Sequence, residues 1–378
     1  MKPAPTKGLQ NSLDNSTYDF SALELKYGGF LVPSVKLVIG GRVIDATGVP
    51  LPTVSVDIDS GKAAGGASVV IEDMYDLENS KWLDNLLDTV KVGETLEIHA
   101  GYGTKKLIFY GYIDSVSVSY SGNALPSITF SGIDASGYLM NAVTSKYFEN
   151  KTLSEAAKEL LGQCVSKGYA KKLEFEDIPD IKIETVKQNM SDYDWLSLLA
   201  ERSGVNFFVV QGVLIYKSVL SFTSPLITLN LGSSLLSFNR SVSLSEQVGK
   251  VVVNSLDKNG KPISGEASSS SLSGSGSEAA DAAPEFNALV KSVAVAAVYT
   301  AEQCKRIAQN LFNKYSLQYV SGKGTCIGLP ELIPGRYIKL GGMDKASNAT
   351  YYIDKVTHSI SASDGFTTEF TLKGAKSL

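Results

Sequence analysis

Two stretches of this 378-residue chain consist of short segments in which apolar and polar residues alternate, with turn residues between them. "VKLVIGGRVI", "VSVDIDSG" and "ASVVIEDM" lie in the first stretch, and "GRYIKLGG", "ATYYIDKVTHSIS" and "GFTTEFTLKG" lie in the second. Because successive side chains of a strand point to opposite faces, this alternation lets each stretch bury one face of a sheet. It predicts a mainly β (α+β) fold with two β regions.

The first β region spans residues 35–145, and its several short strands are typical of a barrel or a sandwich. Gly40-Gly41 has the composition of a hairpin turn. Further along, alternation predicts that Ile113, Val116 and Val118 point inward.

One segment of this region, "NSKWLDNLLDTV", has the spacing of a short amphipathic helix, with Asn79 or Ser80 as its cap. The apolar face of this predicted helix consists of Trp82, Leu83, Leu86 and Leu87.

Residues 146–221 change in texture and are interpreted as an inserted α/β domain. Thr152 and Glu155 form a capping box at the start of a helix. A second helix begins at Ser191 and ends at Gly204, and an apolar hairpin with its turn at Gln211-Gly212 follows it. The buried stripe of the first helix is predicted to be Leu153, Ala156, Ala157, Leu160, Leu161 and Cys164.

The second β region spans residues 222–378 and repeats the outline of strands, one helix and strands. Gly265–Phe286 is rich in small polar residues that bury little apolar area, so it is predicted to be a mobile loop. Thr300 and Gln303 cap the helix that follows. Its inward residues are predicted to be Cys304, Ile307, Ala308 and Leu311.

Bulk composition excludes several classes of protein. The net charge is −4 with scattered Lys and Arg, whereas nucleic-acid binding needs a concentrated basic face. Cys164, Cys304 and Cys326 are odd in number and far apart, which argues against a disulfide framework or a zinc site and favours buried, reduced thiols. The start of the chain lacks the apolar stretch of a signal peptide, and no apolar run is long enough to span a bilayer.

The sequence also lacks recognisable reaction chemistry. His99 and His358 are its two histidines, each inside a strand-like segment where a surface or internally satisfied role is the common one. No His-Glu-x-x-His or Gly-x-Ser-x-Gly motif is present, and the Gly-Lys pairs lack the rest of a phosphate loop. "GYGTKK" at Gly101 is interpreted as a β-turn because no helix follows it. The sequence does not exclude a pair of catalytic carboxylates, but no two acidic residues form a recognisable pair. No catalytic, cofactor-binding or metal-binding residue is therefore assigned.

Two aromatic residues of the second helix, Tyr193 and Trp195, allow two interpretations. Such side chains dominate binding interfaces. They equally form the core between a helix and its hairpin, which is the interpretation we favour.

Three segments together resemble the phage late control protein D and baseplate hub family, which includes the hub region of type VI secretion spike proteins. "NMSDYDWLSLLAERSGVNFFVVQGVLIY" is similar to that family's helix and hairpin, through Ser191–Leu196, Leu199–Arg202, Gly204 and Phe207-Phe208. "GLPELIPGRYIKLGGM" is similar to its Gly-x-Pro strand, through Gly328, Pro330, Ile333, Pro334 and Gly335. "YYIDKVTHSISASDGFTTEFTL" is similar to its ending, through Tyr352, Val356, His358, Gly365 and Thr368.

The resemblance implies a fold and a role. The residues themselves are mixed and polar at first over 1–34, which is interpreted as an extended N-terminal arm. The resemblance implies tube-like β-barrel domains at 35–145 and 222–378, with the α/β domain 146–221 as scaffold. Three chains would close a ring whose six barrels fit a threefold spike to a sixfold tail tube. The implied partners are two further copies, a separate spike protein, the tail tube protein, other baseplate proteins and the tape measure protein, with no cofactor, no nucleic acid and no membrane span. Such a protein is made in the bacterial cytoplasm and assembled into a virion or an extracellular injection particle.

One departure from the type VI hubs is that no oligosaccharide-binding-type domain, β-helical needle or lysozyme module follows the second β region, so the spike tip is expected to be a separate protein. The alternatives are a tail-tip protein of a non-contractile phage, a peptidoglycan hydrolase and a receptor-binding adhesin. The first of these normally carries a C-terminal extension.

Overall fold

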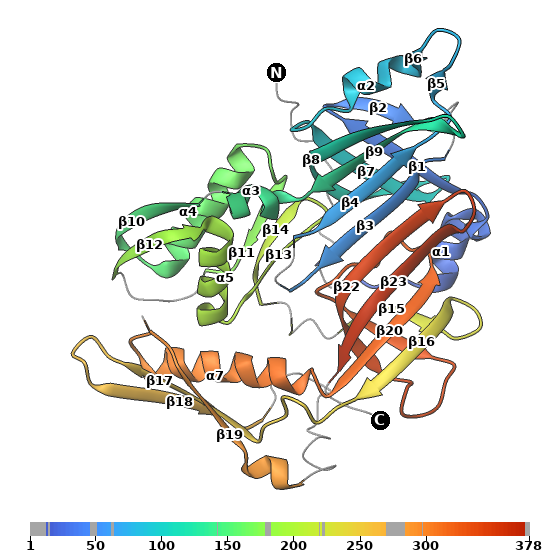
Figure 1. Ribbon diagram of the computed structural model, residues 1–378. Coiled ribbons are helices and arrows are strands. Elements are labelled where there is room, and N and C mark those ends of the chain that lie inside the picture. Colours follow the sequence, from blue (N-terminus) through green and yellow to red (C-terminus); the bar gives the residue numbers. More distant parts are fainter. Residues whose placement is uncertain are drawn as a thin grey trace.

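One twisted sheet of thirteen strands runs through the molecule and collects strands from both β regions (Figure 1). The structure, a computed structural model, describes residues 13, 16–45, 51–61, 64–141, 143–177, 183–218, 220, 224–269, 284–296 and 298–374. The first half of the sheet contains β1 (Pro33–Ile39), β2 (Arg42–Asp45), β3 (Thr53–Asp59), β4 (Gly66–Ile71), β7 (Thr95–Tyr102), β8 (Lys105–Ser121) and β9 (Ala124–Ile133). The second half contains β15 (Pro225–Asn230), β16 (Leu235–Val242), β20 (Val320–Ile327), β21 (Tyr337–Gly341), β22 (Thr350–Ser361) and β23 (Gly365–Gly374). The predicted mainly β fold is confirmed.

Local sequence explains these strands well. Burial alternates along β1, β3 and β23, as a sheet with one covered face requires. Gly40 and Gly41 both have positive φ and form the predicted turn between β1 and β2. In β8, Ile113 is buried and Val116 and Val118 are half-buried. Ile113 and Val116 are three residues apart, which in a regular strand would place them on opposite faces. A register shift between Ile113 and Ser115 marks a β-bulge that keeps both side chains on one face.

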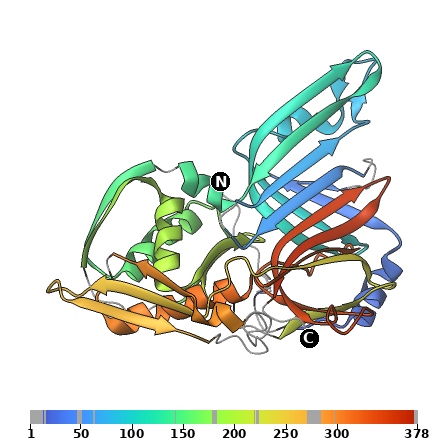
Figure 2. The ribbon, with the colours of Figure 1, turned by 60° about the horizontal axis from the view of Figure 1, so that its bottom comes forward.

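The two halves are joined by antiparallel pairing of β3 with β22, from Asp59–Lys355 to Val54–Ile360. Figure 2 shows the strands of the two halves side by side in one curled layer. Strand β2 ends the sheet at one side and β16 at the other, and a bridge between Leu231 and Leu235 links β15 to β16. Among the described residues, no strand ladder closes either half into a barrel.

Residues 135–217 form a layer of helices against two small sheets beside the main sheet (Figure 1). Thr152 and Glu155 form the predicted capping box, and Ser191 accepts the backbone N–H of Asp194. Gly204 ends its helix with φ +73, as predicted. The elements are α3 (Ala135–Asn141), β10 (Val143–Lys151), α4 (Leu153–Ser166), β11 (Lys172–Phe175), β12 (Ile183–Ser191), α5 (Asp192–Ser203), β13 (Asn206–Val210) and β14 (Val213–Lys217).

A third unit lies between β16 and β20 and was not predicted as a separate sheet. It consists of β17 (Lys250–Leu256), β18 (Pro262–Ala267), η3 (Pro284–Ala288), β19 (Val290–Ala294) and α7 (Ala301–Ser316). Its three strands form their own sheet, and α7 covers it with a separate apolar cluster that includes Val251, Val253, Ile307 and Phe312. The capping box of Thr300 and Gln303 is confirmed. Of the loop predicted at 265–286, residues 270–283 lie outside the described residues, and Gly265 belongs to β18.

The predicted helix at 79–90 is largely wrong. Residues 72–94, which we call the lobe, contain β5 (Tyr75–Asp76), β6 (Lys81–Trp82), η2 (Leu83–Asn85) and a single turn, α2 (Leu86–Thr89). Asp84 and Asn85 have φ +52, which breaks the helix. Trp82 and Leu86 are buried as predicted, but Leu83 and Leu87 are exposed.

The N-terminal arm differs from the extended segment that the sequence suggests. Residues 1–12, 14 and 15 lie outside the described residues. Within the rest, α1 (Phe20–Lys26) and η1 (Gly28–Phe30) lead into β1, and the Asp19 carboxylate accepts the Ala22 N–H as the helix cap.

Candidate functional site: the joints and ends of the sheet

The seam between β3 and β22 connects segments that are 300 positions apart in sequence. The Asp57 carboxylate accepts a hydrogen bond from Thr357 Oγ1 (2.7 Å) and forms an ion pair with the Lys355 ammonium (2.8 Å). At the end of the seam, the Ser60 N–H and hydroxyl both donate to the Asp354 carbonyl, at 2.9 and 3.0 Å. Backbone ladder and side chains therefore hold the two halves together as one sheet.

The Gly-x-Pro segment forms the second joint, an irregular loop whose residues 328–336 are all buried. The Leu329 N–H donates to Thr368 Oγ1 (3.0 Å), and the Gly335 N–H donates to the Ile353 carbonyl (3.0 Å). A Cβ at Gly328 would lie 2.1 Å from the Phe366 ring, so only glycine fits there. The glycines of this motif are required by packing, and no reaction chemistry is needed to explain them.

A buried carboxylate in this loop fastens the N-terminal segment. Glu331 is 2% exposed and accepts from the Tyr27 hydroxyl (2.7 Å) and the Lys26 ammonium (3.0 Å). Burial and the charge of Glu331 raise the pKa of the Tyr27 hydroxyl, so it stays a donor. Nearby, Arg336 donates to the Ser16 carbonyl (2.7 Å). The N-terminal segment is thus bound to the 328–336 loop by side-chain hydrogen bonds, although the two are about 300 residues apart in sequence.

The two histidines lie in different surroundings. His358 is fully buried, with Nδ1 3.0 Å from Thr368 Oγ1, and burial lowers its pKa to about 4. His99 is half-buried, with Nε2 3.2 Å from the Glu97 carboxylate. Burial alone would raise the pKa of Glu97, but hydrogen bonds from His99 and Lys171 lower it to about 2. Both histidines thus have an internal partner, in line with the structural role that we favoured.

The third joint attaches the α/β layer to the sheet. Lys171 reaches the Glu97 carboxylate on β7 (2.8 Å), and the Tyr110 hydroxyl on β8 donates to the Gly168 carbonyl (2.9 Å). A Cβ at Gly212 would lie 2.9 Å from the Tyr110 ring, so the predicted hairpin turn packs directly on the sheet. The hairpin turn that follows α5 is therefore in contact with the main sheet.

The covalent link between sheet and α/β layer contains another buried carboxylate, Asp134, between β9 and α3. It accepts the backbone N–H groups of Gly65 (2.9 Å) and Ser136 (2.8 Å). Burial raises its pKa to about 6, because removal from water disfavours the charged form.

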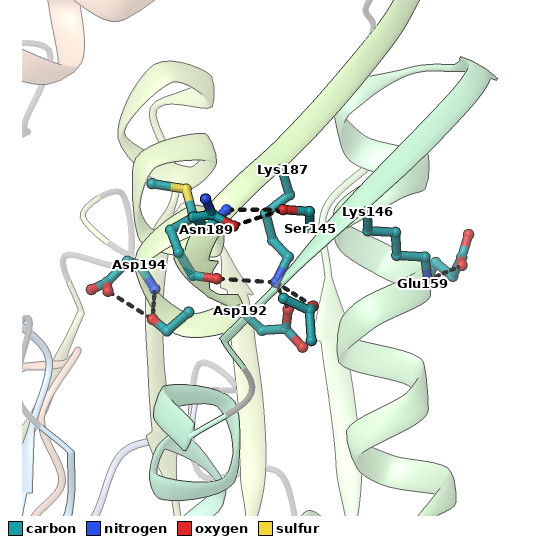
Figure 3. A network of polar contacts seen from close by, with 10 residues as sticks. Ser145, Lys146, Glu159, Lys187, Asn189, Asp192 and Asp194 are labelled. Carbon is teal, nitrogen blue, oxygen red and sulfur yellow. Dashed lines mark hydrogen bonds and ion pairs between the residues drawn. The ribbon is translucent and has the colours of Figure 1, made fainter.

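A network of polar side chains inside the α/β layer contains a fully buried lysine, Lys187 (Figure 3). The Lys187 ammonium donates to Asp192 (2.5 Å), Thr144 Oγ1 (2.9 Å) and the Met190 carbonyl (3.1 Å). These bonds occupy all three of its donors. Lys187 is therefore a tie between β10, β12 and the start of α5, because no donor remains for a ligand.

Tyr193 and Trp195 are both 4% exposed and lie in the core of the α/β layer. The Trp195 ring stacks on Phe148 with centroids 5.1 Å apart, and Tyr193 packs on Phe207. Their interpretation as core residues is confirmed. The three cysteines are free and buried, as expected.

A cavity of about 180 Å³ opens where the sheet, α5 and the end of α7 meet. Its charged groups include Lys373 and Asp354, which pair with each other at 2.8 Å. Among the described residues, no three His, Cys, Asp or Glu side chains are grouped as a metal ion requires. The described helices also include none that is both long and apolar enough to cross a bilayer.

A family model described as the Alg8 N-terminal domain matches residues 32–362, which is most of the chain. The chain belongs to the Alg8 N-terminal domain family. This is a different family name from the late control protein D and baseplate hub family that the motifs resemble. No curated protein sequence matches this Alg8 N-terminal domain chain.

Several solved structures share the fold of this Alg8 N-terminal domain chain. The 43 kDa tail protein of prophage MuSo2 from Shewanella oneidensis has a TM-score of 0.66 at 15% identity, covering 91% of this chain and 98% of the other. The tail protein from Neisseria meningitidis MC58 has a TM-score of 0.64 at 16% identity, covering 90% and 96%. The Escherichia coli c3393 protein, a type VI secretion component similar in structure to bacteriophage T4 gp27 and gp5, has a TM-score of 0.53 at 12% identity, covering 89% and 76%. The predicted resemblance to phage tail proteins is confirmed for the fold.

Proposed function

We propose that this chain is the structural baseplate hub of a contractile phage tail or of a phage-like contractile injection system. In this role it works as a homotrimer that adapts a threefold spike to a sixfold tail tube, and it is not an enzyme. The observation that carries the proposal is the β3–β22 seam, which merges two strand-rich halves into one sheet in a fold shared with phage tail proteins.

The seam supports the symmetry argument. We assign one tube-like barrel domain to each half of the sheet, 35–145 and 222–378, with 146–221 as the inserted α/β domain. One chain then presents two similar halves, and three chains around a threefold axis present six. Rigid joints suit this role, because force passes through the seam and through the buried 328–336 loop.

The ends of the sheet favour contact between copies. Edge strands of monomeric proteins are usually protected by charged side chains or prolines. Here Val43 on β2 and Leu236 and Val242 on β16 are large, apolar and exposed. Leu31 and Val32, just before β1, are exposed as well. A ring of subunits would cover both ends.

In the assembled particle the hub contacts a separate spike protein, the tail tube protein and other baseplate proteins, with the tape measure protein as a further partner. Its place is accordingly inside a virion or an extracellular injection particle.

Light scattering on the purified chain tests the proposal, alone and with the spike protein encoded beside it. We expect a trimer, or a monomer that becomes a trimer when the spike protein is added. A chain that stays monomeric with every neighbouring tail protein contradicts the hub and favours a hydrolase or an adhesin. A muralytic assay and a cell-binding assay then separate these two.

A further inference from the structure

The lobe lies at one end of the molecule (Figure 1), and several of its large apolar side chains are exposed. Leu77 and Val92 are each 65% exposed, and Leu83 and Leu87 are 42% and 40% exposed. The lobe is nevertheless firmly attached. The Trp82 indole N–H donates to the Tyr120 hydroxyl on β8 (3.2 Å). The exposed apolar side chains therefore belong to a segment that is bonded to the main sheet.

Two residues in left-handed conformation direct the leucines outward. A continuous helix would bury Leu83 and Leu87 together with Trp82 and Leu86. The left-handed Asp84 and Asn85 interrupt the helix, and Leu83 and Leu87 face solvent. Arg42 on β2 fixes this arrangement by donating to the Asp84 carbonyl (2.6 Å) and to Thr89 Oγ1 (2.9 Å).

The exposed apolar side chains of the lobe lie among negative charges. Residues 72–94 contain seven carboxylates and two lysines, a net charge of −5 against −4 for the whole chain. The carboxylates are Glu72, Asp73, Asp76, Glu78, Asp84, Asp88 and Glu94. A matching surface therefore needs apolar side chains surrounded by positive charge.

The strands at the opposite end of the sheet combine exposed apolar side chains with more positive than negative charge. Strands β15, β16, β20 and β21 contain no carboxylate. Their charged residues are Arg240, Lys323 and Lys339. Lys323 forms an exposed ion pair with Glu369 of β23, and the Arg240 Nε and Nη2 atoms are buried. Leu236 is 55% exposed, and Leu231 and Val242 are also exposed.

We propose that the lobe of one copy docks on the β15–β16 end of a second copy. Contact between two lobes is disfavoured, because it would place −5 against −5. Two different and complementary patches at opposite ends of a subunit give a head-to-tail contact, which closes into a ring when the rotation permits. This inference rests on the proposed trimer and names the surfaces that hold it together.

Charge reversal on the full chain tests the inference, with the trimer dissociation constant measured by analytical ultracentrifugation at low and high salt. Lowering the charge of the lobe from −5 to −1 with Glu78→Lys/Asp88→Lys, or changing the strands of the other end from +3 to −1 with Lys323→Glu/Lys339→Glu, is expected to raise that constant by at least about tenfold at low salt.

Two controls identify the surface. Glu24→Lys/Glu149→Lys reverses two exposed carboxylates outside the lobe and leaves the trimer unchanged. Leu83→Ser/Leu87→Ser weakens the trimer at both salt concentrations, because the apolar contact is not screened. A trimer that is indifferent to every lobe and β15–β16 substitution overturns this docking and leaves the trimeric hub standing. A chain that never forms trimers overturns both.

Discussion

Each half of the sheet carries an insertion between two of its strands, and the two insertions are stabilised in different ways. The unit between β16 and β20 packs α7 on three strands and has an apolar cluster of its own. The lobe between β4 and β7 has none, because its buried residues, including Trp82 and Leu86, belong to the main core. The first insertion is a small domain, whereas the lobe is an extension of the sheet that keeps apolar side chains for an outside contact.

The two halves also differ in how burial acts on their titratable groups. Burial raises the pKa of Asp134, at the end of the first half, to about 6. Burial lowers the pKa of His358, in the second half, to about 4. The same physical cause favours the neutral form in both cases, which is protonated for the carboxyl group and deprotonated for the imidazole.

The largest expected effect comes from Gly265 on β18, where α7 lies directly on the strand. A Cβ there would be 2.1 Å from the Lys305 nitrogen, so Gly265→Val must push the helix away. We expect a loss of roughly 3 kcal/mol or more. Hydrogen exchange should show it first in α7, β17 and β18, because this unit has its own core. Gly122→Ala, where no atom lies within 4 Å, serves as the control and should leave exchange unchanged.

The pH dependence of stability distinguishes the two halves. Asp134, raised from 3.8 to about 6, contributes stability that is present below pH 3.8 and lost as pH rises through 6. His358, lowered from 6.5 to about 4, contributes stability that is present above pH 6.5 and lost as pH falls through 4. Each term is about 3 kcal/mol, and in the wild type the two oppose each other between pH 4 and 6.5.

Substituting either residue removes its pH-dependent contribution to the unfolding free energy and leaves that of the other residue. Relative to the wild type at the same pH, Asp134→Asn should lose about 3 kcal/mol of unfolding free energy as pH falls from 6.5 to 4. His358→Gln should lose about the same as pH rises from 4 to 6.5. Urea unfolding at a series of pH values measures both. Parallel pH profiles for the wild type and both variants would contradict the assigned pKa values.

The attachment of the lobe should depend on the bond between the Trp82 indole and the Tyr120 hydroxyl. Trp82→Phe and Tyr120→Phe each remove it, and Tyr120→Phe should cost about 1 kcal/mol. The double variant should cost less than the sum of the two single changes, because the bond is lost only once. Strict additivity in urea unfolding would show that the bond does not hold the lobe.

The smallest effect is expected on the exposed face of the lobe. Leu83→Ser/Leu87→Ser should change the unfolding free energy of the dilute monomer by less than about 0.5 kcal/mol per site, since both side chains already contact water. The matched change Leu86→Ser removes a side chain that is 2% exposed and should cost more than about 2 kcal/mol. Equal losses in the two variants would mean that the lobe buries Leu83 and Leu87 in solution.

Helix caps and turns could be read from the sequence because they depend on neighbouring residues. The capping boxes at Thr152 and Thr300, the helix stop at Gly204 and the turn at Gly40-Gly41 all occur where predicted. The lobe was mispredicted, because its spacing suits a helix, whereas Asp84 and Asn85 are left-handed and the Asp84 carbonyl accepts a hydrogen bond from Arg42 on β2, which lies far away in sequence. The separate sheet of β17, β18 and β19 was missed for a similar reason. Alternation of apolar and polar residues predicts a strand but not the strand with which it pairs.

Sequence by itself thus determined the β-rich character, the amphipathic helices and their ends, because periodicity and capping act over a few residues. Tertiary structure alone decided that β3 pairs with β22, that the 328–336 loop is buried around Glu331, and that Asp134 and His358 lie out of water. Each of these arrangements joins groups that are distant in sequence. Their free energy depends on both partners and on the solvent they exclude together, which no local pattern contains.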